Sequence, residues 1–498
     1  MANVVDRIWQ HAVTDPHRIA LRTPSEELTY GELIRRAACF GGRLRRSGLE
    51  PGDRMVLIAP TRPEFVIAYL GAQIAGVVAV TMNTMATDHE IDWVLADSGA
   101  SLVVDWHSGT GAGAVAAAKH GVRYEMLAPG VGVVAESMLP EPMSRRPDDT
   151  AVLLYTSGTT GKPKGVELTV ANLTHTAGVY IDQLGLVPDD RVGTGLPLFH
   201  VFGQAVALLT ALSLGCPCSL LDGFTPAGML DLVRDHRLTI VAGVPTMWSA
   251  MLQAGADHGP DDLRSLRLAA SGGAALRPDL VEAFGQRYGC RLSQGYGLTE
   301  STGAATYMAP DRQYPPGSVG QALPGTEIEI RDNGGSVLPV GAVGAIYLRG
   351  PSIMKGYWRR PEETAAELSG GWLATGDLGH LDSDGCLFVV DRLKDLIIRG
   401  GYNVYPTEVE EVLYGHPGIA ELAVIGVPDV RYGEEVAAVV VPRPGHSLTA
   451  EEIRDWAKQR LSAYKVPHRF AFVDALPLGP TGKVLKRAVD RSVFTDPS

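Results

Sequence analysis

A short apolar run that leads into a glycine-rich, hydroxyl-rich segment constrains this chain more than any other feature. Residues 151–155, Ala-Val-Leu-Leu-Tyr, predict a buried strand. The next residues are Thr156-Ser157-Gly158-Thr159-Thr160-Gly161-Lys162-Pro163-Lys164-Gly165. Glycines let backbone N–H groups approach a phosphate, hydroxyls donate hydrogen bonds, and lysines supply positive charge. The spacing is not that of a P-loop, because no Gly-Lys-Ser/Thr follows at the required distance. A phosphate-binding loop after a strand explains the pattern better than a plain surface turn does.

The N-terminal part of the chain alternates helical and strand-like stretches. Residues 30–47 predict a helix, residues 54–59 a buried strand, and residues 65–82 a helix followed by a strand. The last stretch is apolar enough to consider as a membrane span, but Pro63, Gln73 and internal glycines favour a core helix and strand. This alternation predicts βαβ units and parallel sheet.

The remainder of the chain differs in composition and in the periodicity of its apolar residues. Residues 107–150 are rich in Gly, Ala and Pro with weak periodicity, and we expect surface connections there. Residues 317–349 alternate with a period of two, which predicts antiparallel sheet. The last hundred residues predict helices over 408–414 and 449–461 and strands over 419–427 and 435–441, hence a small α+β domain.

Composition excludes several classes of protein. A chain of 498 residues that is 45% hydrophobic and 20% charged is typical of a soluble protein of several domains. Its net charge of -12 argues against a nucleic-acid partner. Five scattered cysteines argue against a disulfide framework. The N-terminus lacks a signal-peptide pattern, so we expect a cytoplasmic protein without a transmembrane segment.

A second motif, Ser293-Gln-Gly-Tyr-Gly-Leu-Thr-Glu300, has the groups that a nucleotide and its metal require. Tyr296 offers a flat face for a base, and the glycines beside it allow close packing. Thr299 offers a hydroxyl, and Glu300 an oxygen ligand that suits Mg²⁺. A Gly-Tyr-Gly turn alone is weak evidence, but it gains weight beside the first motif.

Two further motifs lie nearer the C-terminus. In Trp372-Leu-Ala-Thr-Gly-Asp377-Leu-Gly379, a carboxylate suited to a ribose diol occurs in what is otherwise an ordinary turn. Pro480-Thr-Gly-Lys483-Val-Leu-Lys486 contains two lysines, the second of which we expect at the surface.

In this order, over about Leu28 to Lys486, the motifs resemble the adenylate-forming superfamily: acyl-CoA synthetases, adenylation domains of nonribosomal peptide synthetases, and beetle luciferases. The resemblance implies an α/β fold with a large N-terminal domain of mixed sheets flanked by helices, and a small mobile α+β C-terminal domain. It places the domains at residues 1–393 and 394–498, with a pivot at Lys394.

The resemblance also implies ATP, Mg²⁺ and CoA. It makes Lys483 the catalytic lysine, a cation that with Mg²⁺ would stabilise the charge built up as a carboxylate attacks the α-phosphate. His200 and Glu300 are further catalytic candidates, although a histidine such as His200 is commonly a core residue. The implied metal ligands are Thr156 and Glu300. The implied ATP-binding residues are Thr156, Ser157, Gly158, Thr159, Thr160, Gly161, Lys162, Lys164, Gly273, Ala274, Gln294, Gly295, Tyr296, Gly297, Thr299, Asp377, Arg392 and Lys483.

The implied acyl pocket consists of His200, Val201, Val244, Thr246, Gly272, Thr302 and Gly303. Because no arginine occurs among the expected walls, a dicarboxylate is disfavoured, and because the Phe-Asp-x-Ser segment of peptide synthetases is absent, so is an amino acid. Small walls favour an apolar fatty or bulky cyclic monocarboxylic acid. The implied CoA-binding residues are Gly400, Gly401, Tyr402, Tyr432 and Tyr464.

Two segments depart from the family's usual pattern. Thr169-Val-Ala-Asn172 lacks the histidine of Thr-His-x-Asn, and Gly400-Gly-Tyr-Asn403 replaces Gly-Gly-Glu-Asn. Neither removes a core catalytic group, but the second bears on the acceptor thiol.

We therefore expect an ATP-dependent acyl-CoA ligase that forms an acyl adenylate and then a thioester with CoA. The alternatives are a ligase that loads a carrier-protein phosphopantetheine, a luciferase-like oxygenase, and a non-catalytic family member. The sequence leaves open a homodimer and a carrier-protein partner.

Overall fold

The computed structural model describes residues 3–131, 138–157, 163–254, 258–479 and 484–494. The chain divides into two compact units. The first comprises Met1–Glu327 and Leu348–Leu373, and the second Ile328–Tyr347 and Ala374–Ser498. These contact-defined units do not test the expected boundary at Lys394, which is a prediction about where the chain pivots.

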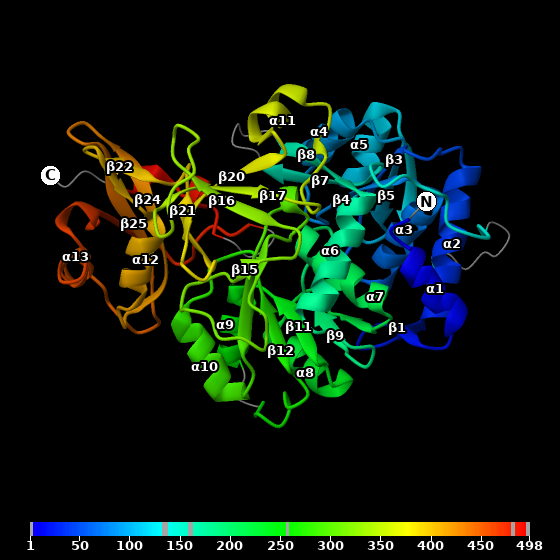
Figure 1. Cartoon of the computed structure of the whole chain (residues 1–498), viewed down its shortest axis with the longest axis horizontal. Coiled ribbons are helices and arrows are strands. Elements are labelled where there is room, and N and C mark those ends of the chain that lie inside the picture. Colours follow the sequence, from blue (N-terminus) through cyan, green and yellow to red (C-terminus); the bar gives the residue numbers. More distant parts are fainter. Residues whose placement is uncertain (1–2, 132–137, 158–162, 255–257, 480–483, 495–498) are drawn as a thin grey trace. The chain divides into compact units, whose positions relative to one another are not determined.

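One sheet of the first unit contains the strand that precedes the glycine-rich segment (Figure 1). The strand order is β18 (Gly356–Tyr357), β8 (Pro163–Thr169), β7 (Thr150–Ser157), β4 (Val78–Met82), β3 (Arg54–Ile58), β5 (Leu102–Trp106) and β6 (Arg123–Leu127). Strands β3 to β7 pair in parallel, as the βαβ pattern predicts, whereas β8 is antiparallel to β7 and to β18. The glycine-rich segment therefore joins the two strands of an antiparallel hairpin.

The other sheet of this unit contains the tyrosine motif. Its order is β15 (Gln321–Ala322), β14 (Thr306–Tyr307), β13 (Leu292–Tyr296), β12 (Leu268–Ser271), β11 (Ile240–Gly243), β9 (Val192–Thr194), β10 (Cys218–Leu220), β1 (Ile19–Arg22) and β2 (Glu27–Thr29). The run from β13 to β1 is parallel. Residues 295–297 therefore lie at the carboxyl end of a parallel strand, where ligands commonly bind.

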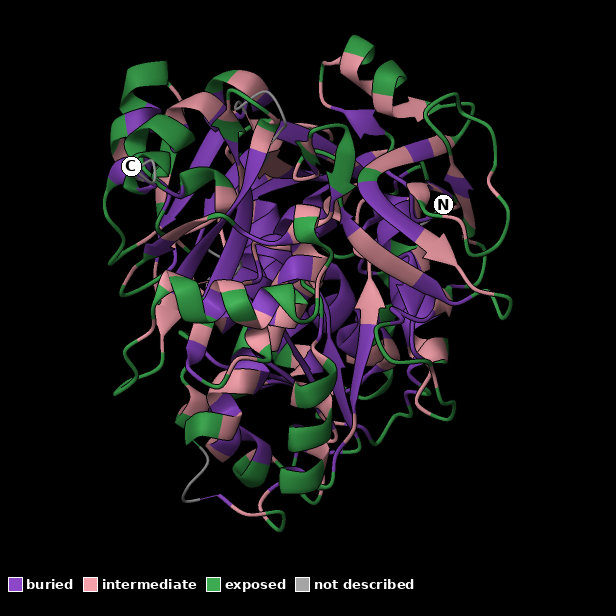
Figure 2. Cartoon of the chain, turned by 90° about the vertical axis from the view of Figure 1, so that its left-hand side faces the viewer, coloured by how far each residue is buried: buried purple, intermediate pink, exposed green. Residues whose placement is uncertain are grey.

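Helices flank both sheets, and buried residues gather on the strands and on the helix faces that cover them (Figure 2). The α-helices are α1 (Asp6–Thr14), α2 (Tyr30–Arg46), α3 (Pro63–Ala75), α4 (Asp88–Ser98), α5 (Ala112–His120), α6 (Val170–Gln183), α7 (Thr210–Leu214), α8 (Pro226–His236), α9 (Pro245–Ala254), α10 (Pro278–Tyr288) and α11 (Pro361–Glu367). A π-helix, η2 (Phe202–Leu209), and a 3₁₀ turn, η4 (Thr299–Ser301), complete the unit's principal helical elements.

The pair α2 and α3 shows how the sequence fixes a core helix. A Cβ atom on Gly41 would lie 2.7 Å from the carbonyl oxygen of Gly71, so glycines let the two backbones touch. Every residue of α3 is buried, and Gly76 ends the helix with a φ of 73°. The prediction of a core helix followed by a strand is confirmed by α3 and β4.

Two further sheets remain: the first is formed mostly by residues of the second unit, although its strand β19 (Leu368–Ser369) belongs to the first, and the other lies wholly in the second unit. The first of these sheets has the order β16 (Glu327–Arg331), β17 (Gly344–Arg349), β20 (Trp372–Leu381) and β19, with β21 (Leu387–Arg392) paired to β20. The other has the order β23 (Tyr402–Val404), β22 (Ile397–Arg399), β25 (Gly433–Pro442) and β24 (Ile419–Asp429), with β26 (Arg469–Phe472) paired to β25. Helices α12 (Pro406–Tyr414) and α13 (Ala450–Lys458) accompany it, which confirms the predicted α+β texture.

The expectation of surface connections over residues 107–150 is wrong for residues 112–127. Helix α5 and edge strand β6 occupy part of this stretch. The helix buries small alanines, Ala112, Ala116 and Ala117, which leave little amphipathic signal. The strand is largely exposed at the end of its sheet, so it shows no clear alternation of apolar and polar residues.

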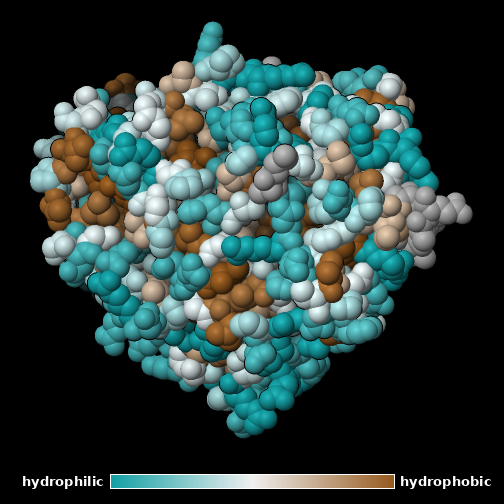
Figure 3. All heavy atoms as spheres, turned by 45° about the vertical axis from the view of Figure 1, so that its right-hand side comes forward, coloured by the Kyte–Doolittle hydropathy of each residue, from teal (hydrophilic) through white to brown (hydrophobic). Residues whose placement is uncertain are grey.

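The five cysteines are free and buried. Hydrophilic side chains predominate on the face drawn in Figure 3, where hydrophobic ones form separate patches. Among the described residues, no helix is both long and apolar enough to cross a membrane.

Candidate active site

The hairpin of β7 and β8 holds both ends of the predicted phosphate loop. Tyr155 is paired with Gly165 and Thr156 with Lys164. A Cβ atom on Gly165 would lie 3.1 Å from the ring of Tyr155, so glycine leaves room for that ring. The predicted phosphate ligands Gly158, Thr159, Thr160, Gly161 and Lys162 lie outside the described residues, as do the side-chain surroundings of Ser157.

The carboxylate of Asp97 holds the strand that enters the predicted phosphate loop. The Tyr155 hydroxyl donates to Oδ2 of Asp97 at 2.8 Å, and the Arg360 guanidinium lies 2.7 Å from Oδ1 of Asp97. The Trp358 indole N–H donates to the Asp97 carbonyl at 3.2 Å. Burial, and then Asp97, raises the pKa of Tyr155, so the hydroxyl keeps its proton. The strand that leads into the loop is thus tied to α4 and to the segment before α11.

The two predicted metal ligands lie together. The Thr156 hydroxyl is 3.5 Å from Oε1 of Glu300, which comes from η4. Hydroxyl and carboxylate oxygens are hard donors that suit Mg²⁺. Among the residues described, no cluster of three or more His, Cys, Asp or Glu side chains fits a metal. Two protein oxygens, with ATP phosphates and water as the other ligands, nevertheless match the usual protein site for Mg²⁺.

Lys164 is held by another carboxylate. Its Nζ lies 2.9 Å from Oε1 of Glu367, and only 8% of the lysine side chain is exposed. The same Nζ lies 4.6 Å from the ring centroid of Tyr357. The hydroxyl of Tyr357 in turn lies 3.2 Å from Oε1 of Glu300. A chain of side chains therefore connects Lys164 to the predicted metal ligand.

The tyrosine motif packs as its glycines suggest. A Cβ atom on Gly295 would lie 2.7 Å from the carbonyl oxygen of Thr306, and one on Gly297 would lie 2.5 Å from the carbonyl carbon of Gly303. Tyr296 and Thr299 are half-buried. The Gln294 amide is bonded on both sides, since its Nε2 donates to the Ser318 carbonyl at 2.7 Å and its Oε1 accepts from Leu276 N–H.

Several predicted acyl-pocket residues meet around η2. A Cβ atom on Gly303 would lie 3.6 Å from Val201, and one on Gly272 would lie 3.2 Å from the ring of Phe202. His200 Nδ1 accepts a hydrogen bond from the Phe202 N–H at 3.2 Å. The remaining pocket and loop residues divide by exposure: Thr302 and Val244 are buried, Gly273 is half-buried, and Thr246 and Ala274 are exposed.

The predicted ribose pair comes together in the second unit. Asp377 and Arg392 are directly opposed in β20 and β21, and Arg392 Nε lies 3.3 Å from Oδ1 of Asp377. Asp377 is buried, whereas Arg392 and the predicted pivot Lys394 are exposed.

The predicted CoA-binding residues form two contacts in that same unit. The rings of Tyr402 and Tyr464 stack with centroids 4.8 Å apart. The Gly400 N–H donates to the Tyr432 carbonyl at 2.8 Å, and a Cβ atom on Gly400 would lie 3.2 Å from the Tyr432 ring. Gly400 and Gly401 have φ values of 57° and 86°, which glycine adopts easily.

Lys483 lies outside the described residues, but its neighbours are fixed. Leu478 and Val484 form an antiparallel bridge, and Leu485 N–H donates to the Pro477 carbonyl at 2.8 Å. The expectation that Lys486 is a surface residue is met only in part. Its side chain is 21% exposed, and its Nζ lies 2.7 Å from Oε1 of Glu410, a carboxylate that α12 provides.

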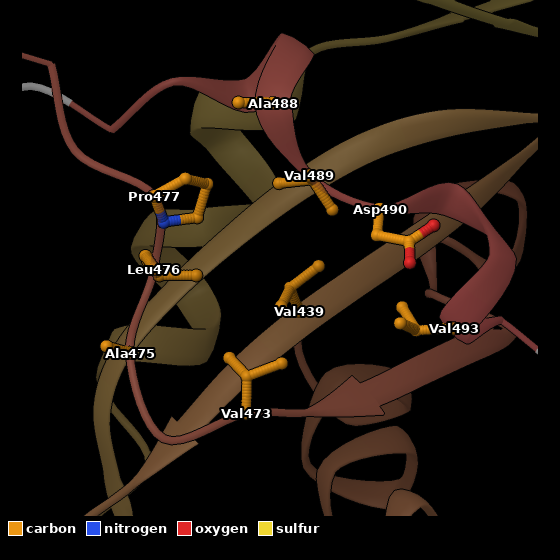
Figure 4. A pocket seen from close by; sticks show the side chains of 9 residues that line it. All are labelled: Val439, Val473, Ala475, Leu476, Pro477, Ala488, Val489, Asp490 and Val493. Carbon is orange, nitrogen blue, oxygen red and sulfur yellow. The ribbon is translucent and has the colours of Figure 1, made fainter.

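A cavity of about 340 Å³ in the second unit is lined mainly by apolar residues (Figure 4). None of the predicted site residues lines it. Its lining residues are Val439, Val473, Ala475, Leu476, Pro477, Ala488, Val489, Asp490 and Val493.

Sequence reasoning missed Asp97, Tyr357 and Glu367. Asp97 lies inside a helix with no motif around it. For Tyr357 and Glu367, the available signal was the Gly356-Tyr357 dipeptide, which precedes a proline that begins an acidic helix.

Comparisons with known proteins show the family to which the chain belongs. Residues 8–358 match the family described as AMP-binding enzyme, and residues 408–483 match the AMP-binding enzyme C-terminal domain. A feruloyl-CoA synthase from an Amycolatopsis species is 40% identical over 97% of each chain. A long-chain-fatty-acid–CoA ligase from Bacillus subtilis is 33% identical over 95% of this chain and 91% of the relative. The B. subtilis o-succinylbenzoate CoA synthetase, solved with ATP and a magnesium ion, has a TM-score of 0.87 at 33% identity over 97% of this chain and 98% of the other.

The fold and the matched family models define an adenylate-forming acyl-CoA synthetase. The chain belongs to the AMP-binding enzyme family, with both its main and its C-terminal domain. It is an AMP-forming acid–thiol ligase of acyl or aryl acids that uses ATP, Mg²⁺ and CoA.

Proposed function

We propose that this ligase activates an apolar monocarboxylic acid, and that arylpropenoic acids such as ferulate are its preferred class. The acid would attack the α-phosphate of MgATP to give an acyl adenylate and pyrophosphate. The thiolate of CoA would then displace AMP and leave the thioester. The observation that carries the substrate class is the set of small or apolar wall residues around η2, which contains no cation for a second carboxylate. The 40% identity to a feruloyl-CoA synthase supports the aryl choice over a fatty acid.

A screen of acids with CoA tests this proposal. Ferulate, benzoate, palmitate, 2-succinylbenzoate and malonate would each be assayed for AMP formation, and the products identified by mass. Highest kcat/KM with ferulate supports the proposal. Preference for palmitate would replace the aryl class with a fatty one, and preference for malonate would refute an apolar pocket.

The nucleotide roles belong to the same proposal. The segment from Thr156 to Lys164 would surround the β- and γ-phosphates, and Tyr296 would stack on adenine, with Gly273, Ala274, Gln294 and Thr299 nearby. Lys483 would stabilise the adenylation transition state. We expect Lys483→Ala to abolish carboxylate-dependent pyrophosphate release and to leave thioester formation from supplied acyl adenylate largely intact. Equal loss of both steps would exclude this role.

The pivot at Lys394, between domains 1–393 and 394–498, is also a proposal. It is supported by the exposure of Lys394, which lies in the sequence between the predicted ribose residues Asp377 and Arg392 and the predicted CoA residues that begin at Gly400. Lys394→Pro would restrict the backbone φ at this position. We expect Lys394→Pro to slow thioester formation and to spare acyl-adenylate formation. An unchanged ratio of these two rates would count against the pivot.

A further inference from the structure

The hydroxyl of Tyr357 lies between two carboxylates. It is 3.2 Å from Oε1 of Glu300 and 2.5 Å from Oε2 of Glu367. The phenol carries one proton, and it donates that proton to one carboxylate at a time.

The position of this hydroxyl is fixed from several sides. Tyr357 is 5% exposed, and its strand β18 pairs with β8, where Tyr357 faces Val166. Its backbone N–H donates to the Thr364 hydroxyl at 2.9 Å. The Lys164 ammonium covers the ring at 4.6 Å. Contacts to its backbone, its ring face and its hydroxyl hold the buried side chain of Tyr357. Its hydroxyl therefore offers Glu300 a hydrogen-bond donor at a fixed position.

Charge is balanced around Glu367. Lys164 Nζ lies 2.9 Å from Oε1 of Glu367, while the Tyr357 hydroxyl contacts Oε2 of the same carboxylate. The lysine thus neutralises the carboxylate that competes with Glu300 for the phenol proton. Lys164 leaves the predicted phosphate loop at its C-terminal end, so the loop and the metal ligand share this support.

We propose that Tyr357 is a positioning residue that orients the Glu300 carboxylate toward Mg²⁺, and that Lys164 and Glu367 act on the metal site through Tyr357. The inference deepens the proposed function, on which it rests for the identity of Glu300 as metal ligand. Groups that hydrogen-bond a metal ligand fix its direction, and their loss typically weakens metal binding by about 10–100-fold. A tyrosine that only packs would leave metal affinity unchanged.

Tyr357→Phe removes the hydroxyl and keeps the ring. Tyr288→Phe is the matched control, since its buried hydroxyl donates to the Met251 carbonyl at 3.1 Å and it lies at the end of α10, whereas Glu300 lies in η4. Mn²⁺ would be titrated into each full-length protein with α,β-methylene-ATP present, and free Mn²⁺ followed by electron paramagnetic resonance. We expect Tyr357→Phe to raise the Mn²⁺ Kd about tenfold or more, with Tyr288→Phe like the wild type. A Kd within twofold of the wild type would overturn the proposal.

Glu367→Gln provides the second arm, which decides the matter if Tyr357→Phe fails to fold. In the wild-type background it should lower the Mn²⁺ Kd, because a neutral amide competes less than a carboxylate for the phenol proton, and an unchanged Kd would overturn the proposal. Beside Tyr357→Phe it should have no further effect, since residues that act through one another are not additive. Additive effects would overturn the route through Tyr357. Failure of the proposed function is separate, because it is read from carboxylate-dependent pyrophosphate release by the wild type, which the Mn²⁺ titration does not require.

Discussion

The Tyr155 hydroxyl lies 2.8 Å from Oδ2 of Asp97, so a helix carboxylate supports the strand that enters the phosphate loop. Arg360 contacts the other oxygen of the same carboxylate. The Asp97 side chain is 13% exposed, which limits screening of this pair by solvent. The entry strand is thus fixed by a charged group that has no proposed contact with substrate.

Asp97→Asn should therefore lower both stability and ATP affinity. The amide can still accept from Tyr155 but leaves Arg360 without its charge partner at Asp97. We expect the free energy of unfolding to fall by about 1–3 kcal/mol and the KM for ATP to rise, as measured by urea unfolding and by initial rates. Asp455→Asn, in an exposed pair with Lys458, is the control and should change neither value appreciably. Loss of stability with an unchanged KM would confine Asp97 to a structural role.

Asp377 should set the preference for a ribose over a deoxyribose. If its carboxylate accepts from the ribose hydroxyls, the wild type should use ATP better than 2′-deoxy-ATP. Asp377→Asn should reduce that difference in kcat/KM, because a hydrogen bond to a charged group contributes about 1.5–3 kcal/mol. Full discrimination in the variant would remove Asp377 from the ribose site. Asp382→Asn, which alters a turn carboxylate of the same unit, is the comparison.

Lys486→Met should strengthen a pH dependence of stability that comes from Glu410 and that Lys486 otherwise weakens. Burial raises the pKa of Glu410, and Lys486 opposes this shift. Without the lysine, the folded chain binds the proton more strongly than the unfolded chain does. Stability relative to the wild type should be nearly retained at acid pH and lost as pH rises through the raised pKa. Urea unfolding at several pH values measures this, and a pH-independent difference would contradict it.

Tyr402→Ala should affect the thioester step alone. Tyr402 is 61% exposed and stacks on Tyr464, so it offers an aromatic face to a thiol-bearing ligand. We expect a several-fold rise in the KM for CoA without a change in acid-dependent pyrophosphate exchange. Phe472→Ala, another exposed aromatic of the second unit, should change neither. A change in pyrophosphate exchange would move Tyr402 from the CoA site to the adenylation site.

The sequence predicted the elements that have strong local signals. The helix at Tyr30 begins with a Thr29–Glu32 capping box, and α3 ends at a glycine with positive φ, so both ends follow from residue types. The proximity of Thr156 and Glu300 followed from the motifs and their resemblance to one family. Helix α5 escaped prediction because its buried alanines carry little periodic signal.

Contacts between residues that lie far apart in the sequence could not be predicted. Asp97 is separated from Arg360 by most of the first unit's sequence, and neither residue lies in a motif. The contact of Lys164 with Glu367 depends on the pairing of β18 with β8, a short strand pair without a sequence signature. From the sequence, Lys164 was predicted only as a phosphate ligand. The fold shows that the carboxylate of Glu367 is its partner.

The burial of all five cysteines makes the native chain a ready host for site-directed spin or fluorescent labels. Desolvation raises the pKa of the Cys216 and Cys218 thiols to about 12, which suppresses the thiolate that reacts with maleimides. Val13 and Val430 are highly exposed, one in each unit, and cysteines introduced there would react selectively. Distances between the two probes, recorded with ATP and then with CoA, would follow the two halves of the enzyme through a turnover without removal of any native sulfur.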